Sequence, residues 1–82
     1  MLTVEYSDSL LKTISRLKDT TVKGQIKKQI KKIIENPEIG KPMRYVRKGT
    51  RELYIGSFRL AYAYLKKEQK IILLDLYHKD EQ

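Results

Sequence analysis

Three residues in the C-terminal half have side chains suited to chemistry on a phosphate group, and the first of them is Arg59. It lies in a stretch in which bulky and small residues alternate, as in a strand exposed on one face. This period places Phe58, Leu60, Tyr62 and Tyr64 on one face and Arg59, Ala61, Ala63 and Leu65 on the other. We expect the bulky face to pack on helices and Arg59 to project from an open face. There its planar guanidinium suits a phosphate, although an arginine that only solvates a strand would fit the same pattern.

His78 and Glu52 are the other two candidates. His78 is the only histidine and follows the last predicted strand. Histidine titrates near neutral pH, so it can act as a general acid or base, but a lone surface histidine often has no function. Glu52 is the only acidic residue between Lys41 and Leu65. It could serve as a base, or as a structural ion-pair partner of Arg51 or Arg44.

The charge balance favours a polyanionic partner. The 82 residues include 18 Lys and Arg against 10 Asp and Glu, which gives a net charge of +8. Nucleic acid and acidic protein are both compatible with this excess, as is a lysine-rich soluble surface. The densest basic stretch has no acidic residue and consists of Lys41, Arg44, Arg47, Lys48 and Arg51.

Several classes of protein are disfavoured. With no cysteine and one histidine, the sequence predicts no disulfide, no metal site and no cofactor. The first residues do not have the pattern of a signal peptide, and no apolar run approaches the about 18–20 residues of a membrane span. We therefore expect a cytoplasmic protein without a membrane partner.

The N-terminal half predicts a strand and a helical hairpin that would cover a sheet. A short β-prone stretch, Leu2 to Tyr6, ends at Ser7-Asp8-Ser9, which suits a helix N-cap. Leu10, Leu11, Ile14 and Leu17 then recur at helical spacing. A second cap, Asp19-Thr20-Thr21, precedes an amphipathic helix that should end near Asn36, before Pro37. Its apolar stripe is Val22, Ile26, Ile30, Ile33 and Ile34, and Lys27, Lys28, Lys31 and Lys32 lie opposite.

The C-terminal half predicts three strands. Leu53 to Ile55 is followed by a tight turn at Gly56-Ser57, a strand from Phe58 to Leu65, and a last strand from Ile71 to Tyr77. The order is β-α-α-β-β-β, an α+β fold with a small, mainly antiparallel sheet, in one domain spanning residues 1–82. Because the helices can cover one face only, we expect an open basic face.

The whole chain resembles the RelE/ParE superfamily of toxins. The stretches that carry the likeness are Gly40-Lys41-Pro42, Leu53 to Tyr62 with its glycine, aromatic and arginine, and Leu73 to Lys79. The resemblance implies the toxin of a type II toxin–antitoxin pair, of the RelE class. Such a toxin is a metal-independent endoribonuclease that cleaves mRNA in the ribosomal A site through attack by the RNA's own 2′-hydroxyl.

The resemblance also implies roles for individual residues. Arg59 matches the sheet arginine that stabilises the phosphate, and His78 and Lys79 match the C-terminal catalytic tip, with His78 as the best candidate acid. The segment from Arg44 to Arg51 matches the basic region that grips the ribosome or RNA, and we count Lys41 with it. Some relatives place a glutamate base after the Lys-Pro pair, where this chain has Met43. Others use lysines on the strand before the turn, where this chain has Thr50 and Glu52, which leaves Glu52 or Lys48 as the candidate base.

The resemblance implies a RelB-like antitoxin as the protein partner. We expect the apolar stripe of one helix to be incompletely buried by the sheet and to receive this antitoxin. Two alternatives remain: a ParE-like inhibitor of DNA gyrase with the same fold, and a non-catalytic nucleic-acid-binding module. The His78-Lys79 ending favours the nuclease over the gyrase inhibitor. The aromatic residues of the strand from Phe58 to Leu65 fit a core better than a stacking surface, which disfavours the binding module.

Overall fold

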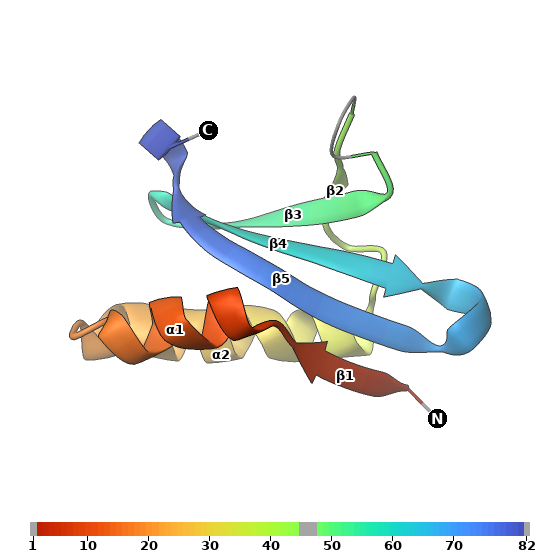
Figure 1. The fold of residues 1–82 in the computed structure, drawn as a ribbon, viewed down its shortest axis with the longest axis horizontal. Coiled ribbons are helices and arrows are strands. Elements are labelled where there is room, and N and C mark those ends of the chain that lie inside the picture. Colours follow the sequence, from red (N-terminus) through yellow and green to blue (C-terminus); the bar gives the residue numbers. More distant parts are fainter. Residues whose placement is uncertain (1, 45–47, 82) are drawn as a thin grey trace.

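The chain folds into a mixed β-sheet with two helices against one of its faces (Figure 1). The structure is a computed structural model and describes residues 2–44 and 48–81. Within these residues the sheet has the order β1-β5-β4-β3-β2. The strands are β1 (Thr3–Tyr6), β2 (Lys41–Pro42), β3 (Thr50–Ile55), β4 (Phe58–Leu65) and β5 (Lys70–His78). β1 runs parallel to β5 and all other neighbours are antiparallel, which confirms the predicted α+β fold.

The two helices begin at the predicted caps. The Ser7 side chain accepts a hydrogen bond from the N–H of Leu10 at 3.0 Å and starts α1 (Asp8–Arg16). The Asp19 carboxylate accepts hydrogen bonds from the first turn of α2 (Thr20–Glu35), which ends before Asn36 and Pro37 as predicted. None of the helices within the described residues is long and apolar enough to cross a bilayer.

The core lies between the helices and the inner face of the sheet. Leu60 and Tyr62 are fully buried, and Phe58 and Tyr64 pack against the same cluster, so the predicted inner face of β4 is confirmed. The helical stripes are covered less completely, because the side chain of Leu11 is 50% exposed and that of Ile34 is 42% exposed. Part of the apolar surface of both helices is therefore left uncovered by the sheet.

The basic segment contains more strand than the sequence predicted. Lys41 and Pro42 form β2 and pair with Glu52 and Arg51. β3 accordingly begins at Thr50, three residues earlier than expected. Charged residues near the edge of a sheet lack the apolar alternation that reveals a strand; here the pairing of β2 with β3, and of β3 with β4, holds them.

A buried tyrosine fixes the connection between α2 and β2. The Tyr62 hydroxyl donates to the carbonyl of Pro37 at 2.7 Å and accepts from the N–H of Gly40 at 2.8 Å. A Cβ at Gly40 would lie 2.7 Å from the tyrosine ring, so only glycine fits there. Burial raises the pKa of Tyr62, and Glu38 adds to this while the Gly40 hydrogen bond and Arg51 oppose it. The hydroxyl therefore keeps its proton at neutral pH and can donate to Pro37.

Replacing this hydroxyl should destabilise the protein measurably. In Tyr62→Phe the half-buried Pro37 carbonyl and the buried Gly40 N–H lose this partner, and we expect the free energy of unfolding to fall by about 1–3 kcal/mol. Urea unfolding followed by circular dichroism measures this. Tyr64→Phe on the same strand is the control, because within the described residues the Tyr64 hydroxyl makes no hydrogen bond. Equal stability of the two variants would show that the hydroxyl of Tyr62 contributes nothing.

Candidate nucleic-acid interface

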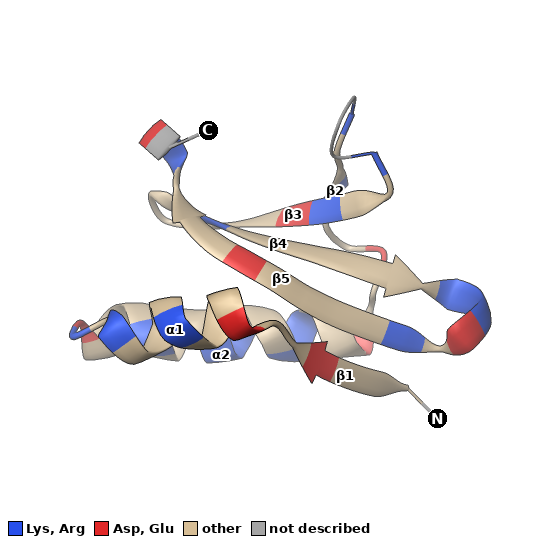
Figure 2. Ribbon diagram, viewed as in Figure 1, with Lys and Arg blue, Asp and Glu red and all other residues tan. Residues whose placement is uncertain are grey.

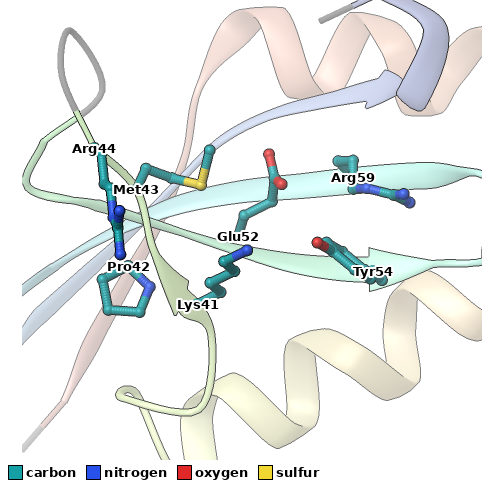
Figure 3. A pocket seen from close by; sticks show the side chains of 7 residues that line it. All are labelled: Lys41, Pro42, Met43, Arg44, Glu52, Tyr54 and Arg59. Carbon is teal, nitrogen blue, oxygen red and sulfur yellow. The ribbon is translucent and has the colours of Figure 1, made fainter.

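A groove of about 490 Å³ lies on the face of the sheet that points away from the helices (Figure 3). Leu53 and Leu60 point towards the helices, so Tyr54 and Arg59, which follow and precede them along their strands, point outward. The groove is lined by Lys41, Pro42, Met43, Arg44, Glu52, Tyr54 and Arg59. Three cations and one carboxylate thus converge on the open face that the sequence predicted to be basic.

Arg59 is held in place by three contacts. Its Nη1 donates to the carbonyls of Gly56 at 3.2 Å and Phe58 at 3.0 Å, both at the hairpin turn. The guanidinium carbon lies 3.9 Å from the centre of the Tyr54 ring. Within the described residues, Nε and Nη2 make no hydrogen bond. Arg59 is therefore fixed on one side and keeps donors for an anion on the other.

Tyr54 was not identified from the sequence. It pairs directly with Arg59 across the β3–β4 hairpin, and its side chain is 52% exposed at the rim of the groove. The signal was present, because a hairpin turn at Gly56-Ser57 places residue 54 opposite residue 59. Counting register outward from the turn would have identified it.

Glu52 lines the groove, and strand alternation places it on the face of β3 opposite to Arg51. It is 4% exposed, and the strand pairing places Lys41 directly across from it. Arg44 lines the same groove (Figure 3). A carboxylate beside cations in a groove provides a proton acceptor next to groups that bind a phosphate.

Arg51 does not line the groove, whereas the sequence grouped it with the basic residues expected to bind nucleic acid. Arg51 and Glu52 are consecutive residues of β3, where a blue and a red segment adjoin in Figure 2, so strand geometry places their side chains on opposite faces of the sheet. Arg51 Nη1 donates to the carbonyls of Glu38 at 3.0 Å and Gly40 at 2.8 Å, and Nη2 lies 3.8 Å from the Glu38 carboxylate. Arg51 therefore helps Tyr62 to hold the connection between α2 and β2 in place. Lys48 is exposed in the turn before β3, and Arg47 lies outside the described residues.

His78 and Lys79 do not join Arg59 in the groove. Arg59 pairs with Tyr77, so His78 lies on the opposite face, beside its own partner Phe58. The rings of Phe58 and His78 meet edge to face at 5.6 Å, and Nδ1 of His78 lies 3.4 Å from the Asp80 carboxylate. Lys79 is exposed, and its N–H donates to the Ser57 carbonyl at 2.8 Å. His78 thus lies on the face opposite to Arg59, and Lys79 does not line the groove.

Metal ligands do not gather in the part of the chain that the structure describes. Residues 2–44 and 48–81 hold no group of three His, Cys, Asp or Glu side chains that could bind a metal ion.

Comparison with known proteins places the chain among the toxins of type II toxin–antitoxin systems. A family model described as "ParE toxin of type II toxin-antitoxin system, parDE" matches residues 4–82. No curated protein sequence matches the chain.

Similar solved structures include three toxins. The toxin chain matched in the E. coli RelBE toxin–antitoxin complex has a TM-score of 0.79 and 19% identity, over 95% of this chain and 96% of that one. A YoeB/ParE toxin from Agrobacterium tumefaciens has a TM-score of 0.82 and 14% identity, over 94% and 98%. E. coli YafQ has a TM-score of 0.76 and 20% identity, over 99% and 97%. At these identities the structural matches establish the fold, whereas the family match extends over nearly the whole sequence. The chain is a member of the ParE toxin family, within the RelE/ParE superfamily of type II toxin–antitoxin toxins.

Proposed function

We propose that this toxin is a ribosome-dependent, metal-independent endoribonuclease that cleaves mRNA in the A site. The observation that supports the proposal best is the fixed Arg59 guanidinium in a groove that also contains Glu52 and Lys41. Cleavage by an internal 2′-hydroxyl needs a proton acceptor, cations on the phosphate and a proton donor for the leaving oxygen. The groove offers one group for each task.

In the proposed reaction, Glu52 removes the proton of the 2′-hydroxyl as its oxygen attacks the adjacent phosphorus. Arg59 binds the phosphate oxygens, on which negative charge accumulates. The bond to the 5′-oxygen breaks, and this oxygen takes a proton from the Lys41 ammonium, leaving a cyclic 2′,3′-phosphate and a 5′-hydroxyl. We assign the role of the acid to Lys41 rather than His78, because Lys41 lines the groove and lies directly opposite Glu52 in the backbone pairing of β2 with β3.

Primer extension on a reporter mRNA with translating ribosomes tests the proposal. We expect cuts inside codons that require both the toxin and the ribosome and that leave a cyclic 2′,3′-phosphate and a 5′-hydroxyl. Cuts that leave a 3′-hydroxyl and a 5′-phosphate would contradict attack by the RNA's own 2′-hydroxyl. Absence of cuts would reject the nuclease.

Gyrase inhibition is the second candidate. The match to a ParE family model and the position of His78 outside the groove both favour it. Loss of gyrase supercoiling activity in the presence of the purified toxin, with no effect on mRNA, would establish this alternative.

We also propose that an antitoxin of RelB type docks on the helices. Toxin structures with this fold include complexes with RelB antitoxins. Here a hollow of about 430 Å³ is lined by Tyr6, Ile30 and Ile34, with Lys27, Lys31 and Glu35 beside them. Apolar residues flanked by two lysines and one glutamate leave an excess of positive charge, which fits an amphipathic segment with acidic residues at its margins.

Placing a charge in this hollow should release the antitoxin. We expect Ile34→Asp to weaken antitoxin binding more than tenfold in calorimetry, because burying an unpaired carboxylate opposes docking. Ile39→Asp is the matched control, since Ile39 is also 42% exposed but does not line the hollow. Equal affinity of the two variants would place the antitoxin elsewhere.

A further inference from the structure

A second hollow, of about 220 Å³, lies beside the groove and shares Tyr54 with it. It is formed where α2 passes the end of β3, and its lining includes Lys28, Gln29 and Lys32. Tyr54 stands between the two hollows with its ring about half exposed. A flexible ligand that fills the groove can therefore continue over Tyr54 onto the helix.

The helix reaches this position because the outer edge of β3 is only partly covered by a strand. β2 pairs with Arg51 and Glu52 and ends there, so in the described part of the chain no strand lies beside Tyr54 on this side. Instead Gln29 of α2 donates from Nε2 to the Tyr54 carbonyl at 3.2 Å. Figure 3 shows the helix running beside this end of β3. This hydrogen bond holds α2 beside the end of β3 and so keeps the second hollow next to the groove.

Four of the five lysines of α2 form two pairs with different surroundings. Lys28 and Lys32 are one turn apart on one face, are exposed and line the second hollow. No acidic residue lines this hollow, and neither lysine has an ion pair within the described residues. Lys27 and Lys31 line the apolar hollow proposed for the antitoxin. The second hollow thus offers two cations to a ligand.

We propose that Lys28 and Lys32 form an extended subsite that binds backbone phosphates of the single-stranded RNA leaving the groove across Tyr54. The proposal rests on the proposed function, because it takes the groove to hold RNA. Two lysines are suited to binding backbone phosphates rather than particular bases, because their contacts are electrostatic and independent of sequence. The subsite would add affinity for long strands and take no part in bond breaking.

Fluorescence anisotropy with the full chain and 2′-O-methyl RNA tests the subsite, because such RNA lacks the attacking hydroxyl and cannot be cleaved. Oligonucleotides of about four and about twelve nucleotides cover the groove alone or both hollows. We expect Lys28→Gln/Lys32→Gln to bind the longer strand roughly tenfold more weakly and to reduce the slope of log affinity against log salt by about 1.4. Binding of the shorter strand should be unchanged.

The double variant Lys27→Gln/Lys31→Gln is the matched control, with the same charge change on the same helix. Equal losses in both double variants would show an effect of net charge and overturn the subsite. Equal affinity of the wild-type chain for the two lengths would also overturn it. Loss of antitoxin binding but not RNA binding in Lys28→Gln/Lys32→Gln would assign these lysines to the antitoxin. Failure of the nuclease proposal is seen separately, as absent cleavage of ribosome-bound mRNA by the wild type.

Discussion

Arg59→Ala should lower the rate of ribosome-dependent mRNA cleavage by about two to three orders of magnitude. The guanidinium is already positioned by Tyr54 and by two backbone carbonyls, so it meets the phosphate without reorganising. Removing this fixed donor destabilises the transition state more than the bound substrate, because the negative charge on the phosphate oxygens is largest in the transition state. Single-turnover cleavage on ribosomes programmed with one mRNA measures the effect.

The control for this variant is Arg16→Ala. Arg16 is exposed at the end of α1, in the helical layer behind the sheet, and its loss changes the net charge equally. We expect Arg16→Ala to cleave like the wild type. A similar loss in both variants would mean that Arg59 acts through overall charge, and full activity of Arg59→Ala would remove it from the mechanism.

The outward direction of Arg59 could be predicted from the sequence, because it depends only on the residue pattern of its own strand and the turn before it. β4 alternates bulky and small residues, and the glycine turn before it fixes where it starts. The caps at Ser7 and Asp19 were equally local. Features set by the chemistry of a few neighbouring residues were therefore recovered.

The rest of the site depends on pairing between distant strands. His78 was grouped with Arg59 because both resemble catalytic residues of the superfamily, but the β4–β5 register places them on opposite faces. A bulge between Ala61 and Tyr62 in this pairing shifts the register once along the strands. The register and the bulge depend on how two strands pair, so the residue pattern of either strand by itself does not predict them.

The roles of Arg51 and Gly40 were hidden for a similar reason. The sequence placed Arg51 in a basic run, whereas its guanidinium binds carbonyls that belong to the connection after α2. The sequence indicates Gly40 only through the family resemblance, whereas its physical cause is the Tyr62 ring, which leaves no room for a Cβ at residue 40. Charge composition predicted a basic surface, but which cations face it was decided by backbone pairing.

Glu52→Gln tests the assignment of the base and should have the second large effect. The amide keeps the size and hydrogen-bonding capacity of the side chain but cannot take the 2′-hydroxyl proton, so we expect cleavage to fall by about two to four orders of magnitude. RNA binding should not weaken, because removing a negative charge from the groove cannot reduce its attraction for phosphate. Cleavage and anisotropy on the same preparation separate the two effects.

His78→Gln is the decisive comparison, because His78 was the acid implied by family resemblance. If Lys41 and Glu52 do the proton transfers, His78→Gln should cleave within a few-fold of the wild type, since its ring lies against Phe58 on the other face of the sheet. A large loss in His78→Gln with full activity in Glu52→Gln would reverse the assignment. It would require the chain after β5 to rearrange on the ribosome and bring the imidazole to the groove. Thermal unfolding of both variants keeps a folding defect from being mistaken for either result.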